Sequence, residues 1–258
     1  MCCSIDKSGA EALIQLLTKP FHVLSINLNN NPLNDDGGYT LINALVQPEK
    51  DIFANETDIP ISRTVSDGDM YSQKAQLKAM AQEEVLIGNL TLTDLRLMNT
   101  NIGKDTLTVL AEVCKCNPIL CRLQMDCNPL KSNDISFLMN EIRVFNKSLR
   151  QMSFNDIQLS IPSFDHSMRV FESNVAITHL SFSSCALQTQ HITRGISRLS
   201  YAKTLVSLNL SSNNIQNVGA TKLSNAMVSS TNTLGQTTIF PLRLSSLTTS
   251  KTCSFFMR

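Results

Sequence analysis

The sequence of 258 residues has few aromatic side chains, no tryptophan and no excess of charge of either sign. Aromatic residues make up 5% of the chain, and 22 basic and 21 acidic side chains leave a formal net charge of +1. Because proteins that bind nucleic acid or anionic membranes usually carry a basic field, this balance argues against both kinds of partner. Nowhere do about eighteen apolar residues follow one another, so we expect neither a transmembrane helix nor a secretory route.

Motifs of the common enzyme classes are also missing. The chain has no G-x-x-x-x-G-K-[ST] phosphate loop, no H-E-x-x-H zinc motif, no G-x-S-x-G and no paired C-x-x-C. We therefore expect a protein that is not an enzyme and needs no cofactor. The 8 cysteines are spread along the chain, which favours reduced thiols and a cytoplasmic location over a disulfide framework. Cys114, Cys116, Cys121 and Cys127 fall on different surfaces of the repeat described next, so we expect no metal site.

The chain does contain a repeated frame, L-x-x-L-x-L-x-x-N-x-L, whose first Leu is counted here as frame position one. From the second copy on, the starts are separated by 28, 29, 28 and 28 residues. A small residue and then apolar residues at helical spacing follow the frame, such as Gly219, Leu223 and Met227 in the last copy. The six copies start at Val23, Leu92, Leu120, Leu149, Ile177 and Leu205.

Within the frame, positions four and six are apolar and alternate with polar positions, which is the period of a strand with one buried face. Position nine holds Asn31, Asn128 and Asn213, whose amides we expect to bond the backbone turns of adjacent units. An Asn also stands three residues before the start of four units, which marks the turn from helix to strand. These four residues are Asn89, Asn117, Asn146 and Asn174.

The frame and its period resemble the leucine-rich repeat family, and the 28- to 29-residue unit with a full helix resembles its ribonuclease-inhibitor-like class. The resemblance covers residues 2 to about 228. It implies an α/β fold, a leucine-rich-repeat horseshoe solenoid with parallel strands on the concave face and helices on the convex face.

The frame also divides the chain into segments. Residues 1–47 hold a truncated N-terminal repeat and the first full repeat, and residues 89–228 hold five further repeats. Residues 48–88 are an insertion, which we expect to form an acidic loop and then a helix over 71–86. Residues 229–258 leave the frame, and their 13 Ser or Thr side chains predict an irregular tail. Because no polar cap shields the first unit, a truncated gene product is one alternative.

The outward strand positions supply the candidate binding surface. Arg96, Arg122 and Arg150 form a basic diagonal over the second to fourth units, with Asp126 toward the other strand end. Because Arg pairs well with carboxylates, we expect this surface to recognise a protein that carries charges of both signs. The candidate partner-binding residues are Asp94, Arg96, Arg122, Gln124, Asp126, Arg150, Gln151 and His179.

These observations predict a non-catalytic cytoplasmic scaffold or adaptor that binds a protein partner through the concave face. A hypothesis from another class is a regulator that activates a small GTPase, with Arg96 or Arg122 as the charge donor in the manner of an arginine finger. Neither the identity of the partner nor the oligomeric state follows from the sequence.

Overall fold

The computed structural model describes residues 3–18, 23–46, 91–174, 176–232, 242–248 and 252–257. The insertion expected at residues 48–88, with its acidic loop and its helix, lies outside the described residues. Asn89, which is expected to mark a helix-to-strand turn, also lies outside them.

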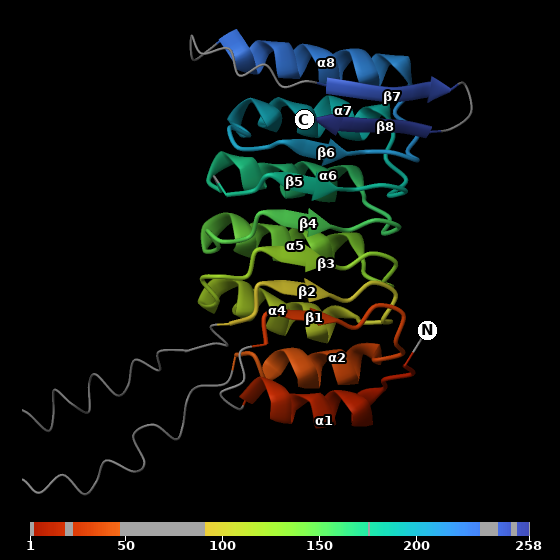
Figure 1. Ribbon diagram of the computed structural model, residues 1–258. Coiled ribbons are helices and arrows are strands. Elements are labelled where there is room, and N and C mark those ends of the chain that lie inside the picture. The colour runs from red at the N-terminus through yellow and green to blue at the C-terminus, as the bar shows by residue number, and fades with distance from the viewer. Residues whose placement is uncertain are drawn as a thin grey trace, which may run out of the picture.

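One open, parallel sheet runs through the repeats (Figure 1). Its strands lie in sequence order, and each pairs in parallel with the next. Every strand occupies frame positions three to five of its unit, so the predicted parallel strands are confirmed. They are β1 (Ser25–Asn27), β2 (Asp94–Arg96), β3 (Arg122–Gln124), β4 (Gln151–Ser153), β5 (His179–Ser181) and β6 (Ser207–Asn209).

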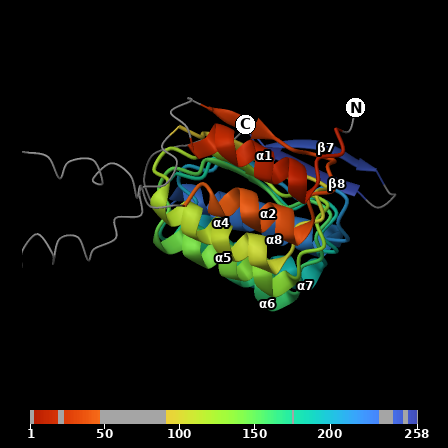
Figure 2. The ribbon, with the colours of Figure 1, turned by 90° about the horizontal axis from the view of Figure 1, so that it is seen from below.

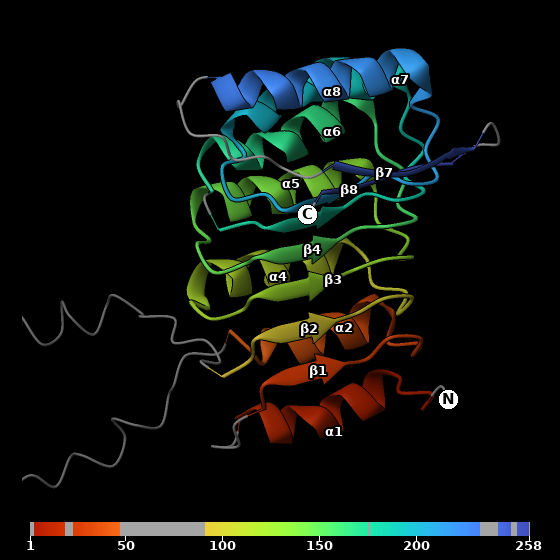
Figure 3. The ribbon, with the colours of Figure 1, turned by 45° about the horizontal axis from the view of Figure 1, so that its top comes forward.

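A helix precedes the first strand, a helix follows each strand from β1 to β6, and the helices form a second layer on one side of the sheet (Figure 2, Figure 3). They are α1 (Lys7–Thr18), α2 (Asn34–Asn43), α4 (Lys104–Cys116), α5 (Ser132–Val144), α6 (Ile161–Met168), α7 (Thr189–Gly195) and α8 (Gln216–Asn232), with 3₁₀ helices at Arg169–Glu172 and Ile196–Tyr201. This alternation of helices with one parallel sheet fits the predicted α/β solenoid. In the described ranges, no helix has both the length and the apolar character needed to span a bilayer.

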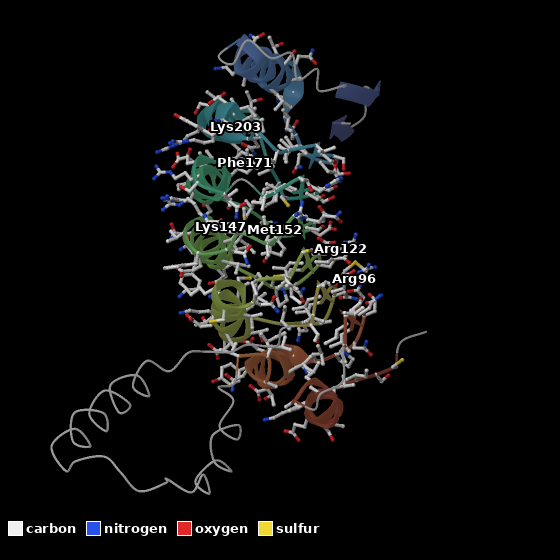
Figure 4. All side chains as sticks on the ribbon, turned by 60° about the vertical axis from the view of Figure 1, so that its left-hand side comes forward. Arg96, Arg122, Lys147, Met152, Phe171 and Lys203 are labelled. Atoms are coloured by element: carbon white, nitrogen blue, oxygen red, sulfur yellow. The ribbon has the colours of Figure 1, made fainter. Side chains whose placement is uncertain are left out.

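The core lies between the two layers and is built from alternate strand positions. Leu95, Leu123 and Leu208, all at frame position four, are 0% exposed. Met152 occupies the same position in the fourth unit, and Figure 4 shows it between the sheet and the helices. Burying a side chain of this kind contributes about 1.5–3 kcal/mol to the free energy of folding. Each copy of the frame therefore adds a further contribution of this kind.

Each described unit bends at frame position eight, just after the strand. The backbone there is left-handed, a conformation that Asn and Asp tolerate better than most other residues. The values of φ are 60° at Asn30, 52° at Asn99, 55° at Cys127, 59° at Asp156, 56° at Ser184 and 55° at Ser212. Polar or small residues at this position therefore fit the turn that leads the chain from the sheet to the helix layer.

The amides at frame position nine join neighbouring units, as predicted. Asn213 Oδ1 accepts hydrogen bonds from the backbone N–H groups of Cys185 and Leu187, both at 2.9 Å. Its Nδ2 donates to the carbonyl oxygens of Phe182 at 2.7 Å and Leu210 at 3.0 Å. One buried side chain thus satisfies backbone groups in its own unit and in the preceding one.

A second set of buried Asn side chains joins the units on the helix side. Asn146 Nδ2 donates to the carbonyl oxygen of Cys114 at 2.7 Å, and Asn174 Nδ2 donates to that of Asn146 at 2.7 Å. Asn146 Oδ1 accepts from the N–H of Leu149 at 2.8 Å, which closes the turn into the next strand. The predicted role of these residues in the helix-to-strand turn is confirmed for the described ones.

Asp35 links the first unit to the second across the insertion. Its carboxylate accepts hydrogen bonds from the N–H groups of Gly103 (2.9 Å), Asp105 (3.1 Å) and Thr106 (2.9 Å) at the start of α4. It therefore caps a helix whose N-cap residue, Gly103, lies 68 residues later in the chain. Burial raises the pKa of Asp35, but these hydrogen bonds and the bond from the Thr106 hydroxyl outweigh burial and hold the pKa below its usual value.

We expect Asp35→Ala to lower the free energy of unfolding by about 0.5–2 kcal/mol, because three N–H groups lose their cap. Since the folded pKa is depressed, this contribution is present above the unfolded value of 3.8 and is lost as the pH falls through the folded value. Denaturation at pH 7 and at a series of pH values decreasing from 3.8 measures both effects. The matched control is Asp36→Ala, whose carboxylate is largely exposed; equal losses for both variants would contradict the capping role.

The C-terminal segment differs from the irregular tail expected for residues 229–258. Helix α8 continues to Asn232, and β7 (Leu242–Thr248) pairs antiparallel with β8 (Thr252–Met257). Strand β8 lies beside β6, at the last edge of the sheet. The prediction was wrong because leaving the repeat frame does not exclude strands, and Thr and Phe, which favour strands, are common in this segment.

Candidate functional site

Two rows of side chains cross the strands on the side of the sheet opposite the helices, which we call the strand face. The parallel register aligns frame position three of each unit with position three of the next, and likewise position five. Because neighbouring strands are about 4.8 Å apart, adjacent members of a row are within contact distance. The position-three row is Ser25, Asp94, Arg122, Gln151, His179 and Ser207, and the position-five row is Asn27, Arg96, Gln124, Ser153, Ser181 and Asn209.

Two arginines converge on one carboxylate in these rows. Arg96 donates to Asp94 through Nε (3.0 Å to Oδ1) and Nη2 (2.7 Å to Oδ2). Arg122 donates from Nη1 to Asp94 Oδ2 at 3.0 Å and from Nε to Gln151 Oε1 at 2.8 Å. Figure 4 shows both arginines on the strand face. Asp94 therefore fixes the direction in which each guanidinium points.

The cluster of Arg96, Arg122 and Asp94 carries a net positive charge. Burial raises the pKa of Asp94, but the hydrogen bonds and positive charges of Arg96 and Arg122 outweigh it and hold that pKa below its usual value. The hydrogen bond and charge of Asp94 in turn raise the pKa of Arg96. Asp94 is therefore ionised at neutral pH, and because arginine side chains are always charged in proteins, two positive charges face one negative charge. The side chain of Asp94 is 14% exposed and that of Arg122 is 41% exposed, so the arginine is more accessible to solvent than the carboxylate that it binds.

A shallow hollow of about 360 Å³ lies on the strand face beside this cluster. Its lining includes Leu123, Met152 and Leu180 at position four, whose side chains point into the core, and otherwise consists of residues with polar or charged side chains. Five of the predicted partner-binding residues come together in this hollow, namely Arg96, Arg122, Gln124, Gln151 and His179. Their role in binding stays a prediction, but the structure places them on one surface.

The other three predicted residues differ from expectation. Asp94 is used to hold the two arginines rather than presented to solvent. Arg150 is exposed, but it stands at frame position two and does not line the hollow. Asp126 was expected to point outward, yet it is only 4% exposed.

The burial of Asp126 has a structural cause. Its carboxylate accepts hydrogen bonds from the N–H of Asn155 at 2.7 Å, from Gln124 Nε2 at 2.8 Å and from the Ser153 hydroxyl. Frame position seven lies at the strand end, where the backbone N–H of the next unit points back at it. Asn155 Oδ1 accepts from the N–H of Ser183 at 2.7 Å in the same way. Asp126 therefore joins units and does not line the hollow.

Ser181, Ser207 and Asn209 were not among the predicted partner-binding residues. All three line the hollow. Their frame positions could have identified these three residues, because the parallel register puts them in the same rows as Arg122 and Gln124.

The buried thiols of Cys114 and Cys185 have a structural role in the packing of the repeats. Burial raises the pKa values of Cys114 and Cys185 to about 12, which makes both poor nucleophiles. Cys185 Sγ donates to the carbonyl oxygen of Phe154 at 3.2 Å, in place of the Asn that other units carry. Among the described residues, no group of three or more His, Cys, Asp or Glu side chains is arranged to hold a metal ion.

The fold and the strand face together define a solenoid of strand–turn–helix units with one exposed sheet surface. The family model described as Leucine Rich repeat matches residues 19–41 and 201–224. These segments contain the first and sixth frames, and the units between them have the same strand and turn. The matches support a leucine-rich repeat protein. No curated protein matches the chain with significant similarity.

Proposed function

We propose that this protein is a non-catalytic adaptor that binds a protein partner in the hollow of the strand face. The observation that carries the proposal is the hollow itself, which gathers five of the predicted residues. Leucine-rich repeat domains commonly mediate protein–protein interaction and are generally not enzymes, which supports this class of function. The regular spacing of the units also supports the ribonuclease-inhibitor-like class, with the strand face as the concave side of a horseshoe.

Unused hydrogen-bond donors in the hollow support the same proposal. Among the described residues, Arg96 Nη1 and Arg122 Nη2 donate no hydrogen bond, although the neighbouring atoms of both guanidiniums are engaged. These donors are held in place by Asp94, so a partner would meet an ordered surface. A fixed side chain loses less conformational entropy on binding than a mobile one.

A cytoplasmic location is part of the proposal. It rests on the thiols, because Cys185 fills an amide position of the repeat frame and donates its hydrogen as a thiol. That role requires a reduced side chain, which a reducing compartment maintains.

The proposal is tested by quantitative co-purification from cells. The double variant Arg96→Glu/Arg122→Glu should reduce recovery of a strand-face partner at least tenfold, because hydrogen bonds to charged groups contribute roughly 1.5–3 kcal/mol each. The matched control is Lys104→Glu/Lys131→Glu, which changes the same number of exposed charges away from the hollow. Equal thermal unfolding of both variants confirms that folding is intact. The same set of partners for both variants would contradict the proposal.

Activation of a small GTPase is the rival function, and the Asp94 cluster argues against it. An arginine finger places its guanidinium on the transferred phosphoryl group. Here both candidate guanidiniums are bonded to a carboxylate, which would repel that group. We expect the chain to leave GTP turnover by a panel of small GTPases unchanged. Stimulation that is abolished by Arg122→Ala would replace our proposal with the rival one.

A further inference from the structure

Apart from Arg96 Nη1, the side-chain groups of the hollow that make no hydrogen bond with other described residues lie in one line. Arg122, Gln151, His179 and Ser207 are consecutive members of the position-three row. Within the described residues, Arg122 Nη2, Gln151 Nε2, His179 Nε2 and the Ser207 hydroxyl make no hydrogen bond. From β3 to β6, therefore, the row presents a guanidinium, an amide, an imidazole and a hydroxyl, in that order.

The position-five row offers less, because its side chains bond to one another and to side chains at position seven. Ser181 Oγ donates to Asn155 Oδ1 at 2.7 Å and accepts from Asn209 Nδ2 at 3.0 Å. Gln124 Nε2 is directed to Asp126. A ligand in the hollow would therefore bind chiefly to the position-three row.

Charge is confined to one end of this row. Arg96 and Arg122 share Asp94, so the lining carries one positive charge in excess at β2 and β3. The β4 to β6 portion is lined by Gln, Ser and Asn side chains and by His179. A carboxylate carries one negative charge and matches the excess, whereas a phosphoryl group carries about −1.5 to −2 at neutral pH. The buried carboxylate of Asp126, which lies beside Gln124, further disfavours a dianion.

The length of the row sets the length of the ligand. Three steps between strands of about 4.8 Å separate Arg122 from Ser207, or roughly 14 Å. An extended chain advances about 3.3–3.6 Å per residue, so roughly four residues cover this distance. Strand β8 lies beside β6 and limits the row at that end.

We propose that the position-three row binds an extended segment of a protein partner in which one Asp or Glu side chain docks on Arg96 and Arg122 and about four uncharged residues follow toward β6. This inference rests on the proposed function and adds the chemistry of the partner. The carboxylate accepts hydrogen bonds from the open Nη groups, and the amide and hydroxyl groups of the row bind the polar backbone of the segment.

The test is a selection of random 12-residue peptides, displayed on phage, against the intact chain. A clone is retained if added wild-type chain elutes it and added Arg122→Glu chain does not. The Lys104→Glu chain is the matched control for this competition. We expect these clones to share one Asp or Glu followed by uncharged residues. Selection against the Arg122→Glu chain should enrich Lys or Arg at that position instead.

Binding of a selected synthetic peptide then measures the contact. Replacing its acid by Gln or Asn, or using Arg122→Gln chain, should each weaken binding about 10- to 100-fold, and combining the two changes should add little. Clones that compete at the hollow without a shared acid would overturn this inference and leave the proposed function standing. If every clone that binds the wild-type chain also binds the Arg122→Glu and Ser207→Arg chains, so that no clone is retained, both the inference and the proposed function fail.

Discussion

Replacing Asn128 by Leu is expected to lower the free energy of unfolding by about 3–5 kcal/mol, because several buried backbone groups lose their partners at once. Asn128 is 5% exposed. Its Oδ1 accepts from the N–H groups of Thr100 at 3.1 Å and Ile102 at 3.2 Å. Its Nδ2 donates to the carbonyl oxygens of Leu97 at 2.7 Å and Met125 at 2.9 Å. Leu fills a similar volume but offers none of these bonds.

Chemical denaturation measures this effect, and two further variants make it specific. Asn140→Leu introduces the same side chain at an exposed position of α5 and should change stability by less than ~0.5 kcal/mol. Asn128→Asp keeps the acceptor but loses the donor, so an intermediate loss is expected. If Asn128→Leu were no more destabilising than Asn140→Leu, the amide would not hold the units together.

Replacing Phe182 by Ala is expected to lower the free energy of unfolding by about 3–5 kcal/mol, since it opens a cavity where three aromatic rings meet. The Phe182 ring stacks on Phe154 with centroids 5.8 Å apart and meets the edge of Phe164 at 5.9 Å. All three side chains are 0% exposed. The cluster joins the fourth and fifth units to helix α6, so its loss weakens an interface as well as a unit.

The control for this prediction is Phe137→Ala, because Phe137 is 42% exposed on α5. It removes the same ring without leaving a closed cavity and should cause a much smaller loss. Hydrogen exchange adds a spatial test, since each unit of a solenoid contacts only its neighbours. Phe182→Ala should increase exchange first in β4, β5 and α6. A uniform increase from β1 to β6 would contradict the local role of the cluster.

The repeat frame was sufficient to predict the strands, their parallel order and the amide of Asn128, because each depends on spacing that recurs in every unit. The aromatic cluster was not predicted, since Phe164 comes from a helix whose contacts the strand frame does not describe. Asp35 was missed for a different reason. It is separated from α4 by the whole insertion, and only the folded chain brings the two together.

The strand face was predicted in part. Outward positions were identified correctly for Arg96 and Arg122, but their pairing with Asp94 was not foreseen. The signal was present, because Asp94 and Arg122 share frame position three and must be neighbours in a parallel register. Asp126 shows that the alternation of apolar and polar positions along a strand does not always predict which side chains are exposed. At the end of a strand, a polar side chain meets the backbone of the next unit and is buried by it.

The most direct test of strand-face binding is site-specific photo-cross-linking of the full chain in cells. A photoreactive amino acid is placed at Gln124 or Ser181 on the strand face, and at Asn140 or Lys222 on the helix side. We expect discrete adducts with the same partner from both strand-face positions, lost when Arg122→Glu is added, and none from the helix side. Adducts that form only from Asn140 or Lys222 would contradict the proposal and move the binding site to the helices.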